Sequence, residues 1–136
     1  MEFEEQVKKV NESNPFMIHN HIRAVSLTED RAVVEAGILP ESLNAMGGVH
    51  GGLMFVMAEM AAGLVTRNDG RKYVTLDSSF RFISGAGQTS RVEAEACITK
   101  RGRTVCFCHS RVYLPETGKT LAEGDFTFYC LGEQGA

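Results

Sequence analysis

The sequence lacks any sign of a division into several domains. It has only three prolines among 136 residues, and no internal repeat, low-complexity tract or Pro/Ser-rich linker interrupts it. With 43% hydrophobic residues, a chain of this length can bury a core without metals or disulfides, but it has no room for a second folded unit. We therefore expect a single domain spanning residues 1–136.

The sequence also lacks a large excess of charge of one sign and any long apolar run. The formal net charge is −3 and the pI is about 5.8, which argues against the concentrated basic face of a nucleic-acid binder. The first ten residues, MEFEEQVKKV, lack the basic tip and apolar centre of a secretory signal. The longest apolar stretch, residues 51–66, is shorter than the roughly 20 residues that span a bilayer. We expect a soluble, cytoplasmic protein that binds neither nucleic acid nor membrane.

The cysteines lack the spacing of a metal site. Two of the four form a C-x-C pair, whereas common zinc sites use C-x-x-C. Without a signal peptide the compartment is expected to be reducing, which disfavours disulfides. We therefore interpret all four as small core residues that bind no metal: Cys97, Cys106, Cys108 and Cys130.

The pattern of apolar residues predicts an α+β domain. Residues 2–11 have helical spacing, and Asn14-Pro15 is expected to end that helix. Residues 21–28 and 31–39 favour a β-hairpin, and the glycine-rich residues 40–52 favour a loop. From residue 51 to about 68, apolar side chains cover most of a helix, which predicts a central helix buried on nearly all sides, ended by Asn68-Asp69-Gly70.

Four further strands are expected after this helix, at residues 73–83, 91–100, 104–114 and 120–131. In the first of them, alternation predicts that Val74, Leu76, Phe80 and Phe82 share the buried face and that Thr75 and Asp77 share the opposite face. About six antiparallel strands would then pack on one helix. Because so apolar a helix needs more cover than one small sheet provides, we expect a homo-oligomer.

Glu59 is the one charged residue inside the apolar helix. The residues three and four positions away from it are all uncharged, so no solvent-facing stripe surrounds it. Burying an ionised carboxylate without partners costs several kcal/mol, and such a residue calls for a functional reason. A carboxylate here can activate water as a general base or attack a carbonyl carbon directly, and the sequence leaves both roles open.

The start of the same helix offers a stabiliser for a developing oxyanion. Backbone N–H groups at a helix N-terminus are aided by the helix dipole. We expect the N–H of Gly51 to act as the donor, with Asn44 contributing or orienting. His50 either binds the carbonyl region or orders its own loop by hydrogen bonds, and both interpretations stay open.

The order of elements and the run N-A-M-G-G-V-H-G-G resemble the hotdog-fold acyl-CoA thioesterases of the PaaI-like branch. The resemblance covers nearly the whole chain. It is carried by the following residues and runs: Asn44, His50, Gly51, Gly52, Glu59, V-T-L-D at 74–77 and K-R-G-R-T at 100–104. The PaaI-like branch usually carries aspartate where this chain has Glu59, and the extra methylene bears on whether the carboxylate attacks directly or through water.

The resemblance implies a hotdog fold, in which a curved antiparallel sheet of about six strands wraps the central helix. It also implies hydrolysis of an acyl-CoA by a homo-oligomer, a dimer of hotdogs expected to assemble into a homotetramer, with the active site at the subunit interface. Thr75 would then help to place the attacking water. For Asp77 a structural or interface hydrogen bond is favoured over catalysis, and both roles stay open. The acyl group, aryl or medium/long-chain, and the choice between dimer and tetramer are left open.

A basic turn formed by Lys100, Arg101 and Arg103 is the candidate site for the CoA moiety. These cations would bind its nucleotide phosphates, although turns also carry charge simply because they are solvated. CoA is part of the substrate, so no separate cofactor is expected. Two other functions compete: a hotdog 3-hydroxyacyl thioester dehydratase or hydratase, whose loops resemble H-F-P-G, and a non-catalytic acyl-CoA binding module.

Overall fold

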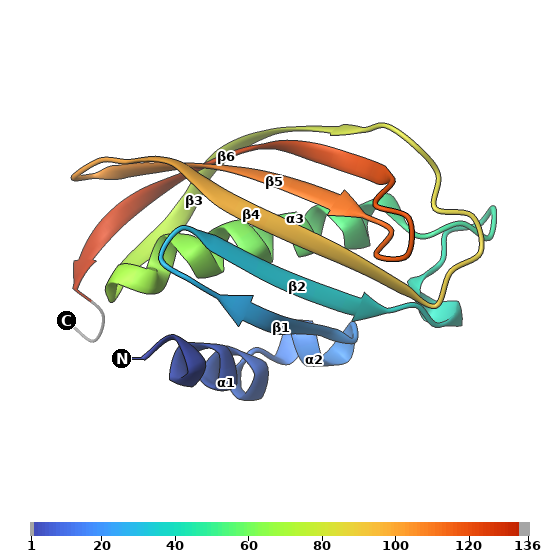
Figure 1. The fold of residues 1–136 in the computed structure, drawn as a ribbon, viewed down its shortest axis with the longest axis horizontal. Coiled ribbons are helices and arrows are strands. Elements are labelled where there is room, and N and C mark those ends of the chain that lie inside the picture. The colour runs from blue at the N-terminus through green and yellow to red at the C-terminus, as the bar shows by residue number, and fades with distance from the viewer. Residues whose placement is uncertain (1, 134–136) are drawn as a thin grey trace.

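The structure is a computed structural model that describes residues 2–133 (Figure 1). One six-stranded antiparallel sheet, in the order β1-β2-β4-β5-β6-β3, curves over the helix α3. The elements follow one another in this order: α1 (Phe3–Ser13), α2 (Pro15–His19), β1 (Ile22–Leu27), β2 (Arg31–Gly37), η1 (Pro40–Ser42), α3 (Gly51–Thr66), η2 (Arg67–Asp69), β3 (Arg71–Phe82), β4 (Arg91–Arg101), β5 (Val105–Tyr113) and β6 (Thr120–Glu133). This confirms the predicted α+β hotdog architecture with a central helix and six strands.

The core lies between α3 and the concave face of the sheet. Ten residues of α3 are buried, and they meet the inward-facing side chains of the strands, among them Val92, Phe126 and Phe128. The helix ends in the short 3-10 turn η2, and Gly70 then adopts a left-handed conformation with φ of 84°. Such a φ favours glycine, so the predicted stop signal at residues 68–70 is confirmed.

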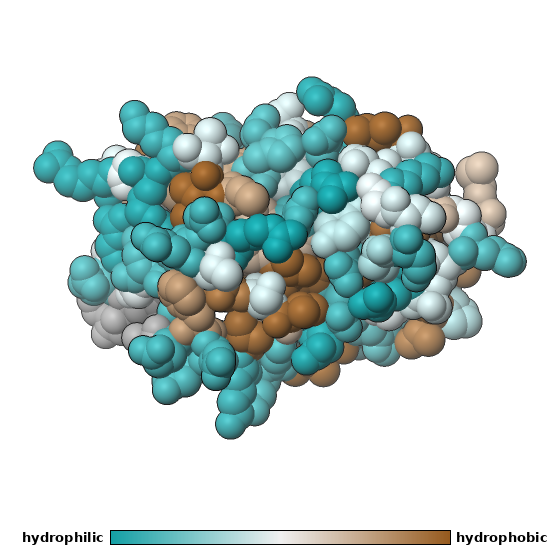
Figure 2. Space-filling model, in the orientation of Figure 1, coloured by the Kyte–Doolittle hydropathy of each residue, from teal (hydrophilic) through white to brown (hydrophobic). Residues whose placement is uncertain are grey.

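The outer face of the sheet is polar. Arg31 and Arg111, on different strands, both bind Glu95, and the Arg111 Nε lies 3.0 Å from the Glu95 carboxylate. His109 hydrogen-bonds Glu123 and Asp125 on β6 at 3.1 and 3.0 Å. The space-filling view shows a largely hydrophilic face, with hydrophobic side chains gathered in a smaller area near its middle (Figure 2). On this face the strands are therefore joined by charged cross-strand pairs and not by a packed apolar layer.

The N-terminal region contains a helix that the sequence did not predict. Asn14-Pro15 ends α1 as expected, but it also begins α2, because the Asn14 Oδ1 accepts a hydrogen bond from the N–H of Met17 at 3.1 Å. Pro15 occupies the first helical position, where its missing N–H costs nothing. The same dipeptide therefore stops one helix and caps the next.

The predicted faces of β3 are wrong at residues 74–77. A β-bulge lies between Thr75 and Asp77, so that Thr75 pairs with Phe128 and Asp77 with Thr127. Because residues paired across strands point to the same side, Thr75 faces α3 and Asp77 faces outward. Val74 and Leu76 are 46% and 58% exposed, so the expectation that they lie on a buried face is also wrong.

Two of the cysteines are core residues. Cys106 and Cys108 are buried under α3, and the hydroxyl of Thr66 lies 3.0 Å from the Cys108 sulfur. Across residues 2–133, no three His, Cys, Asp or Glu side chains gather as metal ligands would. In the same part of the chain, no helix combines the length and the apolar character needed to cross a bilayer.

Candidate active site

The carboxylate of Glu59 is held by the hydroxyl of Thr75. The Thr75 Oγ1 donates to the Glu59 Oε2 at 2.8 Å, which joins the middle of α3 to the inward face of β3. Glu59 is half-buried. Within residues 2–133 its second oxygen, Oε1, receives no hydrogen bond. A carboxylate with one oxygen fixed and one open can accept a proton from water or approach a carbonyl carbon.

The first turn of α3 presents an open backbone donor. Gly51 is the first helical residue, and its N–H finds no acceptor among residues 2–133. Unpaired N–H groups are a general property of helix N-termini, where the dipole adds positive potential. An ideal Cβ built on Gly51 would lie 3.2 Å from the ring of Phe82, so glycine keeps this donor close to the phenyl ring without crowding.

His50 caps the helix that follows it. Its Nδ1 accepts a hydrogen bond from the N–H of Gly52 at 2.8 Å, so this nitrogen carries no proton in that geometry. An ideal Cβ on Gly52 would lie 2.9 Å from the same nitrogen, which explains glycine at this position. Of the two interpretations of His50, the structure displays the one in which it orders its own loop. Its ring is exposed beside a small pocket that Leu53 and Val56 also line.

Asn44 orders the glycine-rich loop. Its Oδ1 accepts hydrogen bonds from the N–H groups of Met46 at 2.9 Å and Gly48 at 3.0 Å. Gly47 between them has a φ of 83°, a conformation that L side chains rarely adopt. The loop thus reverses tightly and delivers the chain to the start of α3. The contacts of Asn44 are those of an orienting residue.

Arg101 is engaged within the protein. Its guanidinium donates to the backbone carbonyls of Val65 and Thr66 and to the side chains of Asn68, Asp69 and Tyr73, at 2.9 to 3.3 Å. These contacts satisfy the last carbonyls of α3. Arg101 is the member of the predicted CoA-binding turn whose Nη1 and Nη2 both hydrogen-bond within the chain. Lys100 and Arg103, its partners in the predicted basic turn, are exposed.

The residues hydrogen-bonded to Arg101 include two whose pKa values are shifted, Tyr73 and Asp69. Burial raises the pKa of Tyr73 to about 12, and the hydrogen bond to the Asp69 carboxylate acts in the same direction. Burial alone would raise the pKa of Asp69, but hydrogen bonds from Tyr73 and Arg71 and the charge of Arg101 hold it below its usual value. The Tyr73 hydroxyl and Asp69 carboxylate are 2.6 Å apart, so the proton stays on the phenol.

Sequence reasoning missed Arg67, whose side chain runs back along α3 toward Glu59. An ideal Cβ on Gly63 would lie 2.9 Å from the Arg67 Nη1, so the guanidinium rests directly over that glycine. Burial lowers the pKa of Arg67, and the charge of Glu59 acts in the opposite direction. The signal available in the sequence is the spacing of Glu59, Gly63 and Arg67, each four residues after the last on one face of a helix.

The helix keeps its two candidate catalytic features apart. Gly51 and Glu59 are separated by eight residues on α3, which corresponds to about 12 Å along the axis. The Gly51 N–H and the Glu59 side chain therefore belong to different turns of the helix, more than two turns apart. The structure thus joins Glu59 with Thr75, and His50 with the N-terminal donor, but it does not bring these two pairs together within one chain.

Comparison with known proteins extends these observations. The model of the thioesterase superfamily matches residues 46–121, from the loop before α3 into β6. Human acyl-coenzyme A thioesterase 13 is 25% identical over 126 residues, covering 90% of each chain. A variant of the phenylacetic acid degradation protein PaaI from Thermus thermophilus is 26% identical, with a TM-score of 0.80 over 87% of this chain and 100% of that one.

A third relative was solved with a ligand. The protein smu.793 from Streptococcus mutans UA159, bound to acetyl CoA, is 25% identical, with a TM-score of 0.76 over 82% of this chain and 90% of that one. The family match spans more than half of the 136 residues, and it includes α3 with Glu59 and β3 with Thr75. The chain therefore belongs to the thioesterase superfamily, as a thioester hydrolase of the PaaI-like hotdog type.

Proposed function

We propose that the protein hydrolyses acyl-CoA thioesters, with Glu59 as the group that activates water or attacks the carbonyl carbon. The observation that carries the proposal is the hydrogen bond from Thr75 to Glu59, which fixes one carboxylate oxygen and leaves the other open. The relatives named acyl-coenzyme A thioesterase and the acetyl-CoA complex of smu.793 support CoA as the thiol carrier. CoA enters as part of the substrate and leaves as the free thiol, and the proposed reaction uses no separate cofactor.

The negative charge that develops on the carbonyl oxygen would be stabilised at the start of α3. The N–H of Gly51 has no partner among residues 2–133 and lies at the positive end of the helix dipole. Such a preorganised donor contributes most in a site that excludes water. His50 and Asn44 hold the loop that aims this N–H, by their bonds to Gly52 and Gly48.

The distance between Gly51 and Glu59 supports a site built from two copies of the chain. β3 is an outermost strand, and no strand of residues 2–133 pairs with its free edge. The opposite edge of the sheet is protected, because Asn11 of α1 hydrogen-bonds both backbone groups of Ala24 in β1. An open edge with exposed apolar residues is suited to pairing with a second copy. Two antiparallel α3 helices would then set Gly51 of one copy opposite Glu59 of the other.

This arrangement defines the proposed assembly as a dimer of hotdogs that can pair again into a tetramer. In such a dimer the CoA moiety would leave the site past a basic surface of either copy. Lys100 and Arg103 remain exposed at the β4–β5 turn. Both could bind the CoA phosphates, the Lys100 ammonium as a point charge and the planar Arg103 guanidinium through two parallel N–H groups. We leave Arg101 out of this proposed role because its Nη1 and Nη2 already hydrogen-bond within the chain.

The reaction class is tested with a panel of acyl-CoAs, aryl and aliphatic, assayed for release of free thiol by purified protein. We expect thiol release from at least one member of the panel. Enoyl absorbance from a 3-hydroxyacyl-CoA without thiol release would instead identify a dehydratase. Tight acyl-CoA binding with no product after long incubation would identify a binding module, and either result contradicts the proposal.

A further inference from the structure

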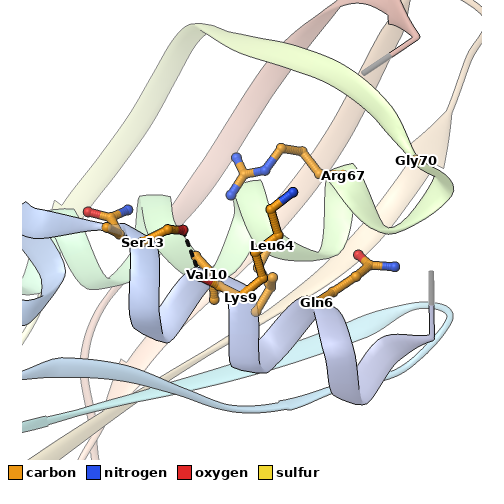
Figure 3. Close-up of a pocket in the computed structure, with 8 residues that line it drawn as sticks. Gln6, Lys9, Val10, Ser13, Leu64, Arg67 and Gly70 are labelled. Atoms are coloured by element: carbon orange, nitrogen blue, oxygen red, sulfur yellow. Dashed lines mark hydrogen bonds between the residues drawn. The ribbon is translucent and has the colours of Figure 1, made fainter. Parts of the chain in front are cut away.

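A second cavity lies on the other side of Glu59 from the helix N-terminus. It has a volume of about 480 Å³ and opens between α1 and the C-terminal half of α3 (Figure 3). Leu64 and Arg67 line it from α3, and Lys9, Val10 and Ser13 line it from α1. The wall therefore combines apolar surface with two cations, and this combination is absent from the site built around Gly51.

The two cations lack an ion-paired anion. No Asp or Glu lines the cavity, and within residues 2–133 neither the Lys9 ammonium nor the Arg67 guanidinium makes a hydrogen bond or ion pair. In Figure 3 both side chains extend into the space between the two helices. Burying the guanidinium carries a desolvation cost that the charge of Glu59 offsets only in part, and a bound anion would offset it further. The cavity is thus built to receive a negative group.

The cavity begins about one helical turn from the catalytic carboxylate. Arg67 reaches back over Gly63, which follows Glu59 by four residues, or about 6 Å along the helix axis. The near wall is fixed by Asn14, whose Nδ2 lies 3.7 Å from the sulfur of Met60, the residue next to Glu59. A chain that starts at a carbonyl beside Glu59 and runs toward the C-terminus of α3 would therefore meet the Arg67 guanidinium over Gly63.

We propose that this cavity binds the far end of the acyl group and selects acyl chains that end in a carboxylate, as in dicarboxylic acyl-CoAs. The inference rests on the proposed function and names its substrate class. Leu64 and Val10 would contact the methylene groups, while Arg67 and Lys9 would bind the terminal carboxylate, Arg67 as a planar fork and Lys9 as a point charge. The phosphates of CoA present similar chemistry, so the experiment separates the two anions.

The experiment compares acyl-CoA pairs of equal chain length: pentanoyl with glutaryl, hexanoyl with adipoyl, and octanoyl with suberoyl. For the wild-type protein we expect a higher kcat/KM for the dicarboxylic member of at least one pair. Arg67→Met should lower that value by about 10- to 100-fold, which is the usual effect of losing a hydrogen bond to a charged group, and Lys9→Met by less. The readout is the ratio of the two kcat/KM values within each variant, dicarboxylic over uncharged. This ratio should fall because the uncharged chain carries no group for either cation to bind.

Lys8→Met is the matched control, because Lys8 lies on the same helix, is exposed and does not line the cavity. Thiol release from the uncharged acyl-CoAs reports on the proposed function independently of this inference. Binding of each pair to the Glu59→Gln protein, measured by calorimetry, tests the cavity without turnover. Equal losses on both members of a pair would assign the cavity to CoA phosphate, and a wild-type protein with no dicarboxylate preference in rate or binding would also overturn the inference.

Discussion

The two ends of α3 differ in how far their hydrogen-bonding capacity is used. At the C-terminal end, Arg101 binds the carbonyls of Val65 and Thr66, and Asp69 is bound in turn by Arg71 and Tyr73. At the N-terminal end, the N–H of Gly51 has no acceptor among residues 2–133. The C-terminal end of the helix is thus closed by the protein itself, whereas the first N–H at the other end keeps its hydrogen-bonding capacity.

The difference indicates how to separate structural from functional polar groups in this fold. A charged group whose donors are all engaged by neighbours stabilises the chain, and it has little left to offer a substrate. A group that is fixed on one side and open on the other, as Glu59 is by Thr75, can do chemistry. We therefore expect substitutions of the open groups, Glu59 and Gly51, to alter rate, and substitution of the fully engaged Arg101 to alter stability.

The largest effect is expected from Glu59→Gln. The amide keeps the shape and can still accept the Thr75 hydrogen bond, but it can neither take a proton from water nor attack, so kcat should fall by about 10³-fold. The free energy of unfolding, measured with urea, should change by less than about 1 kcal/mol. Glu59→Asp, the residue usual in the PaaI-like branch, is the control and should retain part of the activity. An active Glu59→Gln enzyme would remove Glu59 from the chemistry.

Arg101→Met should lower the stability of the protein and leave its catalytic rate almost unchanged, the opposite of Glu59→Gln. It removes the donor to the carbonyls of Val65 and Thr66 and one of several donors to the Asp69 carboxylate, and we expect the free energy of unfolding to fall by about 2–3 kcal/mol. The rate per folded molecule should stay within about twofold, since no reacting group is touched. Arg103→Met, on the same turn but exposed, should leave the urea midpoint almost unchanged. Loss of rate without loss of stability in Arg101→Met would break the distinction between the two ends.

Thr75→Val is expected to have a smaller effect on rate. Valine preserves the shape of threonine but cannot hold the Glu59 Oε2, so kcat should fall by about 10-fold through loss of one hydrogen bond to a charged group. Thr75→Ser restores a hydroxyl and should recover most of this loss. If valine and serine variants have equal rates, the Thr75 hydroxyl does not position the carboxylate.

The smallest effect is expected on the outer face of the sheet, remote from both ends of α3. Burial lowers the pKa of His109, but hydrogen bonds to Asp125 and Glu123 outweigh it and leave the pKa raised. The stabilisation by His109 is therefore complete below about pH 6.5, its unfolded-state value, and is lost as pH rises through the folded-state pKa. Solvent screening limits it to a few tenths of a kcal/mol. The free energies of unfolding of wild type and His109→Gln, measured with urea from pH 5 to 9, should become equal at high pH. A difference between the two proteins that grows with pH would contradict a raised pKa for His109.

Much of this arrangement could be predicted from the sequence, because it depends on local patterns. The apolar periodicity around Glu59 located the central helix, and the glycine-rich run before it located the start of that helix. The predicted strands differ from the observed ones by only a few residues at their ends. These features follow from side-chain periodicity and turn chemistry, both of which act between neighbours in the chain.

The errors lie where tertiary contacts decide. A bulge at Leu76 reverses the faces of β3 and has no marker in the sequence, so Thr75 and Asp77 could not be separated from their spacing alone. The pattern wrongly predicts that Val74 is buried, because an apolar residue on an open edge strand has the same pattern as a buried one. Arg101 looked free in a basic turn, since its partners at residues 65–73 approach it only in the folded chain.

The central claim, that the open end of α3 takes part in the reaction, is tested most directly by comparing Gly51→Pro with Gly51→Ala. Proline is favoured at the first helical position, and the preceding His50 has a compatible backbone with φ of −63° and ψ of 130°. Both variants add a Cβ near Phe82, but only proline removes the N–H. We predict that kcat for acyl-CoA hydrolysis is about 10²-fold lower in Gly51→Pro than in Gly51→Ala, with both proteins folded. Equal rates in the two variants would contradict the account.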